Sequence, residues 1–498
     1  MKKLIVSLLL ILSFITLTSC SKKNESAKTV SDLIVMAIAV DPDGLDPHAT
    51  ASASTFQITS NIYETLLSVD ENGAFIPALA KEWKVSDDGL SITFTLRDGA
   101  KFSNGKICDA YAVIASFNRL KSDKSIRGKD YENIIGITAP DNYTVVFSFK
   151  ELDVASLASF AYPWAAVIDA SEENLKNNPV GTGPYKLSSW MAQESLVLAK
   201  NEYYQGEVKN DGVRFVVMPD LTAEITALER GEVDIILITG DLASAVLNKG
   251  YNLIDAPTNG LQLMAMNNKN EALSDKRVRE AINYAVDKKA LIESVWNGYG
   301  VEIGSHFPVV LKEYVDLAGT YSYDPEKAIE LLKESGYYNN LELKMYLPKN
   351  YQEYVNAGQI IAAELVKVGI KVDVNIVEWA YWLSEVYGGR NYDLTVVGHT
   401  GRLDPYALLV KYKSDGKENY FNYANSEVDQ LLASYKVCTD MDQRTEYAKE
   451  IQRILSDDVP ALYIQDPIQI FVTKSEIEGF KNYPINIYNM KEVKRVSK

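Results

Sequence analysis

The apolar residues of this chain follow two periods, one typical of strands and the other typical of helices. Residues 92–96 and 143–149 alternate apolar and polar side chains, which predicts strands with one solvated face. Residues 370–376 alternate in the same way, directly after a helical pattern over residues 359–368 that ends at Gly369. Strand patterns alternate with helical patterns as far as the C-terminus, and this order predicts mixed α/β layers.

Two helices are marked by their ends as well as by their period. Residues 275–288 place apolar side chains on one stripe, and the expected cap is Ser274 or Asp275. Asp324 is the expected N-cap of another helix, which stops at Gly336. The stripe predicts that the first of these helices lies at the surface and turns its apolar side toward a core.

The N-terminus has the pattern of an export signal. Lys2 and Lys3 precede an apolar run over residues 4–17, which is too short for a stable membrane span, and small residues then lead to Cys20. This order resembles the bacterial lipobox, so residues 1–19 are the expected signal peptide and Cys20 is the expected lipidation site. An ordinary secretory signal with a chance cysteine is the alternative.

Residues 20–31 are polar, small and charged without a period, which predicts a lipid anchor followed by a flexible tether. The protein is therefore expected on the extracytoplasmic face of the cell membrane, or in the periplasm where two membranes are present. Contact with the membrane is expected through the lipid alone, because no other apolar run reaches the length of a span.

Length, charge and cysteine content narrow the classes of protein. The chain has 498 residues, which normally divide into two or three lobes, and its net charge of -16 disfavours a nucleic acid partner. After Cys20 only Cys108 and Cys438 remain, too few for a disulfide framework, and two free buried thiols are predicted. Neither a metal site nor a cofactor is expected.

Residue patterns of common enzymes are missing from the sequence. His48, His306 and His399 are far apart in the chain and form no zinc-binding helix motif. Residues 99–106 resemble a phosphate loop, but one residue too many separates the glycines, and a hairpin turn is predicted instead. Residues 181–185 are interpreted as a structural turn, because their proline removes a backbone donor. We therefore expect no catalytic residues, although scattered carboxylates leave an acid–base pair open.

Several ordered motifs carry a family resemblance. They are L-D-P-H at residues 45–48, I-Y-E-T-L at 62–66, a dense series from Pro77 to Arg119, N-P-V-G-T-G-P-Y at 178–185, R-V-R at 277–279 and the helix over 323–337. With these motifs the chain resembles the family 5 solute-binding proteins of bacterial ABC importers. That family includes dipeptide, oligopeptide and nickel binders.

The resemblance implies an α/β fold of the two-lobed, periplasmic-binding-protein-like type, called type II or Venus flytrap, with an extra subdomain in lobe one. The implied division is lobe one from residues 32–62, 179–266 and 461–498, the extra subdomain from 63–178, and lobe two from 267–460. Hinge strands are expected near residues 260–267 and 461–467. A solute that contacts both lobes then stabilises only the closed arrangement.

Segments that match the cleft-lining parts of the family supply the candidate ligand residues. Trp379, Tyr381 and Trp382 offer flat, amphipathic walls for a flexible solute, although one of the two tryptophans is equally expected in the core. Ser54 lies where the peptide binders offer hydroxyl and backbone groups.

The segment over residues 399–404 departs from the pattern of the peptide binders. Those proteins have an aromatic residue, then an aspartate that holds the ligand's free amine, then an Asp-Pro pair. In their place this chain has the candidate ligand residues His399, Thr400, Gly401, Arg402 and Asp404. A guanidinium cannot accept from an ammonium but binds a carboxylate through two hydrogen bonds. The hypothesis is that the solute presents an anionic group to Arg402, or that its amine is held elsewhere.

Each of these side chains also has a structural interpretation. Arg402 would otherwise pair with Asp404 or lie in solvent, and Asp404 fits the N-cap of a helix that begins at Pro405. His399 alone is a poor metal site, so a packed or hydrogen-bonding role is preferred.

The sequence thus predicts a lipid-anchored, monomeric substrate-binding subunit of an ABC importer, with a peptide or peptide-like solute as ligand. Its partners are the solute and the permease subunits of the membrane. A nickel or metal-chelate receptor of the same class, a secreted hydrolase, and a sensor that reports closure to a receptor stay open as alternatives.

Overall fold

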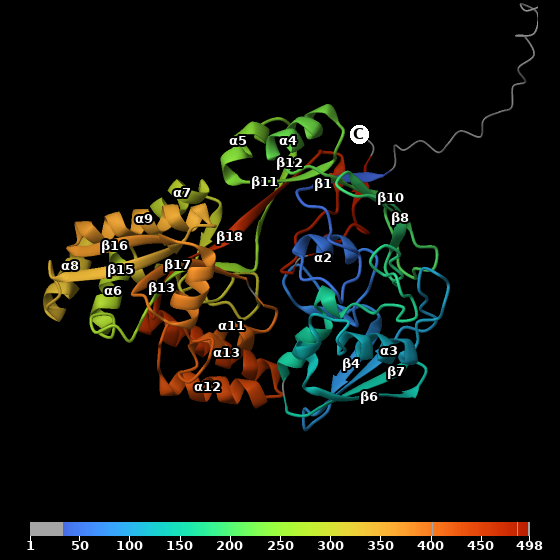
Figure 1. Ribbon diagram of the computed structural model, residues 1–498, viewed down its shortest axis with the longest axis horizontal. Helices are drawn as coiled ribbons and strands as arrows, with labels where there is room; N and C mark the ends of the chain where they lie inside the picture. Colours follow the sequence, from blue (N-terminus) through green and yellow to red (C-terminus); the bar gives the residue numbers. More distant parts are fainter. Residues whose placement is uncertain (1–32, 153, 401, 486, 497–498) are drawn as a thin grey trace, which may run out of the picture.

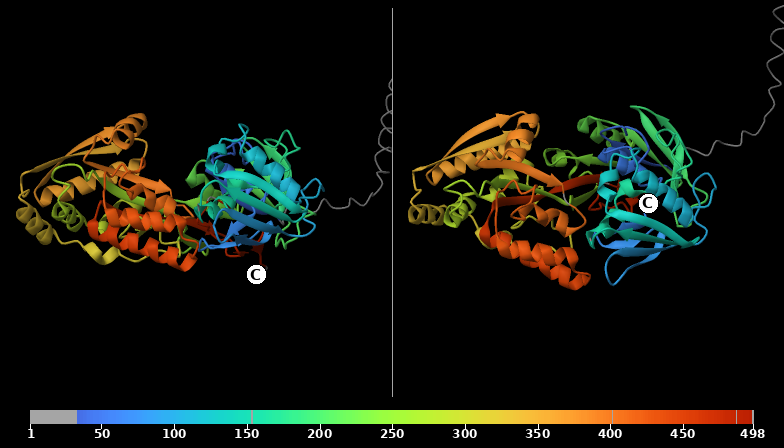
Figure 2. Two further views of the ribbon diagram at one scale, coloured as in Figure 1. Left: turned by 90° about the horizontal axis from the view of Figure 1, so that it is seen from below. Right: turned by 60° about the horizontal axis from the view of Figure 1, so that its bottom comes forward.

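The computed structural model describes residues 33–152, 154–400, 402–485 and 487–496. The predicted signal peptide, Cys20 and the predicted tether lie outside the described residues. Of the helices that are described, none is both long and apolar enough to cross a membrane. Two bodies of structure lie side by side (Figure 1), and Figure 2 shows them from two further directions.

A sheet of 12 strands runs through both bodies. Its strands are β1 (Ile34–Ile38), β8 (Tyr185–Met191), β9 (Ser195–Lys200), β10 (Gly212–Val217), β11 (Ile235–Ile238), β12 (Asn252–Pro257), β13 (Gly260–Met266), β14 (Gly300–Glu302), β15 (Leu341–Pro348), β16 (Ile370–Val377), β17 (Leu394–Thr400) and β18 (Ala461–Thr473). The order is β16-β15-β17-β13-β18-β11-β1-β10-β9-β8, with β12 and β14 paired to β18. Parallel pairs such as β15 with β16 are joined through a helix, so the predicted α/β architecture is confirmed.

The first body contains both ends of the described chain. Its other strands are β2 (Leu67–Val69), β3 (Phe75–Pro77), β4 (Ala80–Val85), β5 (Ser91–Leu96), β6 (Ile134–Asp141), β7 (Thr144–Phe149), β19 (Ile477–Glu478) and β20 (Lys494–Arg495). Its helices are α2 (Ala53–Thr59), α3 (Ala110–Leu120), α4 (Leu221–Arg230) and α5 (Ala243–Val246), with short helices η2 (Gly128–Tyr131), η3 (Val154–Phe160), η4 (Pro163–Ala165) and η5 (Gly240–Leu242). One hydrophobic cluster joins residues between Ile34 and Phe215 to residues between Phe471 and Val493. The C-terminal segment therefore completes the core of the N-terminal half.

The second body is built from the middle of the chain. Its helices are α6 (Lys276–Ala285), α7 (Lys288–Trp296), α8 (Pro325–Ser335), α9 (Gln352–Lys367), α10 (Trp379–Tyr381), α11 (Pro405–Leu409), α12 (Ser426–Val437) and α13 (Met441–Asp458), with short helices η6 (Ala318–Tyr321), η7 (Trp382–Gly388) and η8 (Val410–Tyr412). Two hydrophobic clusters fill this body, and their buried residues lie between Leu261 and Ile464.

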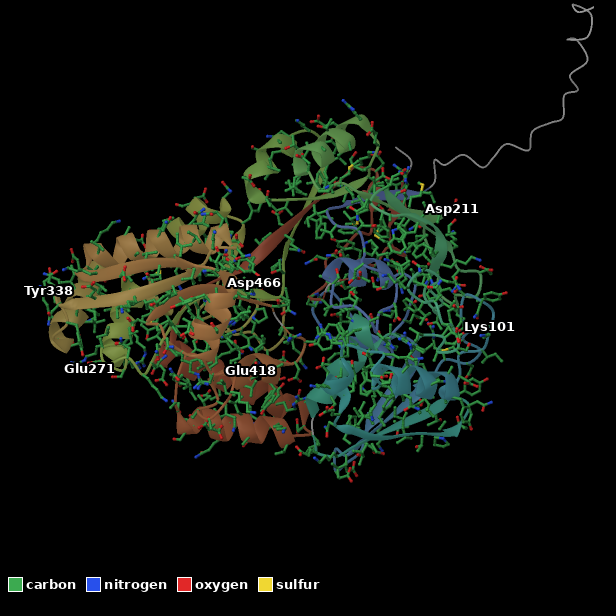
Figure 3. The ribbon with its side chains drawn as sticks, in the orientation of Figure 1. Lys101, Asp211, Glu271, Tyr338, Glu418 and Asp466 are labelled. Atoms are coloured by element: carbon green, nitrogen blue, oxygen red, sulfur yellow. The ribbon has the colours of Figure 1, made fainter. Side chains whose placement is uncertain are left out.

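Two segments cross between the bodies. One is the step from β12 to β13 through residues 257–260, and the other is β18, whose first half pairs with β13 and whose second half pairs with β11 and β12. Asp466 lies in the middle of β18, at the junction of the bodies (Figure 3). Its carboxylate accepts from the backbone nitrogens of Thr258 at 3.1 Å and Val309 at 3.0 Å. One buried carboxylate thus ties the two crossing segments together.

The strand predictions are confirmed, with small changes in the bounds. Strands β5 and β7 bury every second residue, as the alternation predicts. Strand β16 directly follows α9, but Ile376 at its end is 48% exposed and not buried. Helix α9 begins earlier than predicted, because Val355 and Ala357 extend its buried side toward the N-terminus.

The predicted helix over residues 275–288 is two helices in the structure. The Asp275 side chain caps α6, as predicted. The chain becomes extended at Val286, and the Asp287 side chain then caps α7, so a second cap interrupts the apolar stripe. Helix α8 has its predicted N-cap and its predicted glycine stop.

The two glycine-rich segments are turns, as predicted. The Phe102 nitrogen donates to the Lys106 carbonyl at 2.9 Å and closes the first. In the second, the Gly183 nitrogen donates to the Ile62 carbonyl at 2.9 Å, and a Cβ on Gly183 would lie 2.6 Å from the carbonyl carbon of Ile62. The glycine is therefore needed for close backbone packing.

Cys108 and Cys438 are both free, and Cys108 is buried as predicted. The predicted burial of Cys438 is wrong, because this residue follows the end of α12 and is partly exposed.

Candidate functional site

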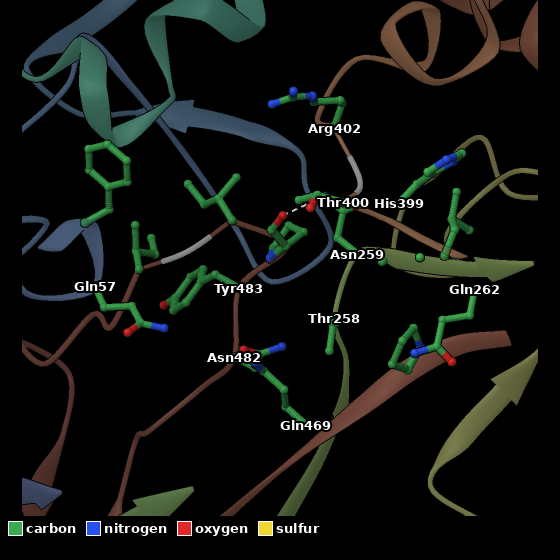
Figure 4. Close-up of a pocket in the computed structure, with 18 of the residues that line it drawn as sticks. Gln57, Thr258, Asn259, Gln262, His399, Thr400, Arg402, Gln469, Asn482 and Tyr483 are labelled. Carbon is green, nitrogen blue, oxygen red and sulfur yellow. Dashed lines mark hydrogen bonds between the residues drawn. The ribbon is translucent and has the colours of Figure 1, made fainter. Parts of the chain in front are cut away.

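A cavity of about 390 Å³ lies between the two bodies. The first body contributes residues of α2 and η4 and of the segment after β19, and the second contributes residues of α9, α10 and β17. Both crossing segments also line the cavity, through Thr258 and Gln469 among others. In Figure 4 the side chains of Gln57, Asn482 and Arg402 approach the space from different sides. Because both bodies build this cavity, a bound solute would contact both.

Aromatic rings line the cavity from both bodies. On the second body, Tyr351 lies edge-on to Trp379 with ring centroids 5.4 Å apart, and it stacks on Tyr354 at 5.1 Å. On the first body, Tyr162 and Trp164 stack with centroids 4.4 Å apart. Pairs of this kind present flat apolar faces with polar edges, which suit rings and peptide planes.

Neutral side chains supply most of the polar lining. Carboxamides are prominent among them, from Gln57, Asn259, Gln262, Gln469 and Asn482. Asn259 is only 3% exposed, and its amide nitrogen donates to the Pro484 carbonyl at 2.6 Å. Its Oδ1 is buried and has no hydrogen-bond partner among the described residues. A buried acceptor without a partner costs free energy.

Arg402 is the only ionised side chain among the described lining residues. It is exposed, and it has no ion-pair or hydrogen-bond partner within the part of the chain that the structure describes. The alternative pairing with Asp404 is not formed, because Arg444 holds that carboxylate at 3.0 Å. The cavity therefore offers one cation and many neutral groups.

Asp404 has a structural role in the observed fold. Its side chain accepts from the Tyr406 nitrogen at 2.8 Å and caps α11, with Pro405 at the first helical position, as predicted. With Arg444 only 4% exposed, the ion pair between Asp404 and Arg444 fixes the end of the loop that carries Arg402.

His399 lines the cavity and belongs to a chain of hydrogen-bonded rings whose other members, His306, Tyr412 and Tyr420, are buried. Its Nδ1 lies 3.0 Å from Nε2 of His306, its Nε2 lies 3.1 Å from the Tyr420 hydroxyl, and Nδ1 of His306 lies 2.7 Å from the Tyr412 hydroxyl. Burial, followed by the charge of Lys411, lowers the pKa of His399 to about 3. Burial also lowers the pKa of His306 well below its ordinary value, with His399 as the next cause. Both imidazoles are neutral at pH 7, and all four ring nitrogens have partners.

The two predicted tryptophans occupy different environments. Trp379 lines the cavity. Trp382 is 3% exposed, and its Nε1 donates to Oγ1 of Thr395 at 2.9 Å, so it packs in the core. Tyr381 is 43% exposed and points outside the cavity lining.

Of the remaining predicted site residues, some line the cavity and others do not. Thr400 lines the cavity, whereas Gly401 lies outside the described residues. Ser54 does not line the cavity. Its hydroxyl lies 2.7 Å from the Ser52 hydroxyl at the start of α2. From the same helix, Gln57 reaches the cavity instead.

Sequence reasoning missed a large part of the lining. Tyr162 and Trp164 flank a proline in a segment without a period, and Tyr483 and Tyr488 lie near the C-terminus. Aromatic residues beside proline in a non-periodic segment were the available signal, since such residues have no helix or strand face to fill.

Comparisons with known proteins agree with this architecture. The model of the bacterial extracellular solute-binding proteins, family 5, matches residues 74–420. The dipeptide-binding protein of Escherichia coli (strain K12) is 27% identical, over 95% of this chain and 98% of that protein.

Two solved structures share the fold. HbpA2 from Haemophilus parasuis matches with a TM-score of 0.86 and 24% identity, over 94% of this chain and 100% of that chain. The nickel ABC transporter structure from Bacillus halodurans matches with a TM-score of 0.84 and 24% identity, over 93% of this chain and 100% of that chain. Both structures therefore show that this chain has the α/β periplasmic-binding-protein fold. By the match of the family model, the chain belongs to the family 5 extracellular solute-binding proteins of ABC transporters, which are solute-binding proteins and not enzymes.

Proposed function

We propose that this protein captures a peptide or peptide-like solute in the cavity between its bodies and delivers it to the permease of an ABC importer. The observation that carries the proposal is that both bodies line one cavity and are joined by two crossing segments. A solute held on both sides favours the closed arrangement by its differential affinity for that state. The likeness to a dipeptide-binding protein supports a peptide-like ligand.

In this proposal the two bodies act as lobes around the crossing segments. Lobe one comprises residues 32–62, 179–266 and 461–498, the extra subdomain 63–178, and lobe two 267–460. The pairing along β18 supports a hinge over residues 461–467, at the edge of lobe one in this division, since residues 461–465 pair with β13 and residues 468–473 pair with β12. The protein acts as a monomer.

The proposed ligand contacts are Trp379, His399, Thr400, Gly401 and Arg402. Ser54, Tyr381, Trp382 and Asp404 then act from behind the lining, by holding the ends of α2 and α10 and the loop before α11. Trp379 supplies a flat wall and Arg402 supplies charge.

The lipid on Cys20 holds the protein at the extracytoplasmic face of the membrane. Incorporation of a labelled fatty acid into the wild-type protein, and its loss in Cys20→Ala, tests this anchor. Release of the wild-type protein into the medium without any label would contradict it.

Binding is tested with protein that has been unfolded and refolded to remove any retained solute. Calorimetry with dipeptides, tripeptides, acylated peptides and a nickel–histidine complex should find a one-to-one ligand, and small-angle scattering should show a smaller radius with that ligand. Trp379→Ala should lose affinity, whereas Tyr111→Ala, at an exposed position outside the cavity, should not. Release of cleavage products would instead indicate a hydrolase.

A further inference from the structure

We infer that the solute carries a carboxylate or a similar anion and lacks a free amine. This inference rests on the proposed function and names the chemical class of its ligand. It follows from the charges around the cavity, since the described lining holds one arginine and neither aspartate nor glutamate.

Three of the carboxylates nearest to the lining in sequence are already engaged. Asp466 is fully buried and accepts from backbone nitrogens on both of its oxygens. Asp404 caps α11 and pairs with Arg444. Glu378 precedes Trp379 but pairs with Lys349 at 2.7 Å, and both side chains are well exposed. Glu353 lies on α9 between the lining residues Tyr351 and Tyr354, but its own side chain is not part of the described lining. None of these four carboxylates is placed to receive an ammonium inside the cavity.

An ammonium would therefore enter the cavity without a counter-ion. It would lose water, find only neutral acceptors, and share the space with the Arg402 guanidinium. His399 does not change this balance, because its imidazole is neutral and its nitrogens are bonded within the protein. The cavity thus selects against free amines by repulsion and by the lack of a carboxylate counter-ion.

The same lining suits a neutral or acidic solute with flat parts. A carboxylate can form two parallel hydrogen bonds with the guanidinium of Arg402. Among the described residues, no protein group pairs with that guanidinium. Aromatic residues line the cavity from both bodies, with Tyr162 on the first and Trp379 on the second, and they suit flat groups of a solute. A peptide with a blocked N-terminus and a sugar acid share this chemistry.

Calorimetry on the refolded protein tests the inference with matched compounds. The first series consists of alanyl-phenylalanine, its N-acetyl form, and the N-acetyl form with an amidated C-terminus. The second series consists of digalacturonate and neutral cellobiose, and it distinguishes a sugar acid from a blocked peptide as the ligand. We expect the acidic, amine-free member of the responding series to bind at least tenfold more tightly than its free-amine or neutral counterpart.

A matched pair of variants assigns the effect to its position. Arg402→Gln should remove the preference for acid over amide, while Arg453→Gln, an exposed arginine on α13 outside the cavity, should leave it unchanged. The solute that copurifies with the native protein, released by denaturation and weighed by mass spectrometry, should fail to react with an amine-specific reagent.

The outcomes separate this inference from the proposed function. Tighter binding of free alanyl-phenylalanine, or a copurified solute with a primary amine, would overturn the inference and leave solute binding intact. No binding by any of these compounds or by the nickel complex, together with no copurified solute, would overturn both.

Discussion

The backbone nitrogen of Leu403 donates a hydrogen bond of 3.1 Å to the hydroxyl of Tyr162, across the cavity from one body to the other. The Leu403 side chain is 5% exposed and packs in the hydrophobic cluster of the first body, although its neighbours in the chain belong to the second. The loop that carries Arg402 is therefore fastened to both bodies in the observed arrangement.

Tyr162→Phe should weaken this fastening without disturbing the ring stack on Trp164. Loss of one hydrogen bond is worth about 1 kcal/mol, so we expect ligand affinity to fall by about fivefold. The melting temperature should change little, because the variant keeps the ring and its packing. Calorimetry and scanning calorimetry measure the two effects, with Tyr111→Phe as an exposed control. Unchanged affinity would show that the contact does not stabilise the ligand-bound state.

Trp379→Ala and Trp382→Ala should separate binding from stability. Trp382 is buried and hydrogen-bonded to Thr395, so its truncation should cost about 3–5 kcal/mol of the free energy of unfolding. Trp379 lines the cavity, so its truncation should mainly reduce ligand affinity. Urea unfolding and calorimetry on both variants measure the difference. Equal losses of stability would mean that both rings serve the core.

Arg444→Met should destabilise the fold strongly. The Asp404–Arg444 pair is almost fully enclosed, and the guanidinium also lies over the Tyr435 ring at 4.4 Å. Removal of Arg444 takes the ion-pair partner from a buried carboxylate, at a cost of about 3–5 kcal/mol.

Urea unfolding measures that loss, and Asp404→Asn added to Arg444→Met should recover part of it, because Asn keeps the helix cap and removes the charge. Arg453→Met, at an exposed position, is the control and should change stability little. A double variant no more stable than Arg444→Met would show that charge is not the cause.

The helices and strands with a clear period of apolar residues were predictable from sequence, whereas the lining of the cavity was predictable only in part. Local signals such as the Asp404–Pro405 cap act within one turn of chain and are visible as spacing. The contact of His306 with His399, and that of Tyr162 with Leu403, join residues far apart in the chain and depend on how strands cross. Of the two adjacent tryptophans, only the fold decides which one faces the cavity.

Stability should fall as the pH drops below about 6.5, the ordinary pKa of histidine. Burial lowers the pKa of His399 to about 3 and that of His48 to about 4, so the unfolded chain takes up protons before the folded protein does. Between pH 7 and pH 5 each of these histidines should cost about 2 kcal/mol of the free energy of unfolding.

Urea unfolding at pH 7, 6 and 5 measures this dependence. His399→Gln should show a smaller loss than the wild type, since Gln does not titrate. Equal losses in His399→Gln and in the wild type would mean that His399 takes up its proton in the folded state as readily as in the unfolded chain.

Asp466 should change the pH dependence of stability in the opposite direction to the histidines. Burial raises the pKa of its carboxyl to about 6, although the backbone nitrogens of Thr258 and Val309 donate to it. The folded protein therefore takes up this proton at a higher pH than the unfolded chain, and acidification from pH 7 to pH 5 stabilises the fold by about 1 kcal/mol through this group.

Asp466→Ala removes this stabilising effect of acid, so the stability of the variant should fall more steeply with falling pH than that of the wild type. It should also lose about 1–3 kcal/mol at pH 7, because the nitrogens of Thr258 and Val309 lose their acceptor. Asp211→Ala, at an exposed surface ion pair, is the matched control in the same urea titrations. If Asp466→Ala and Asp211→Ala showed the same stability and the same pH dependence, Asp466 would not tie the crossing segments together.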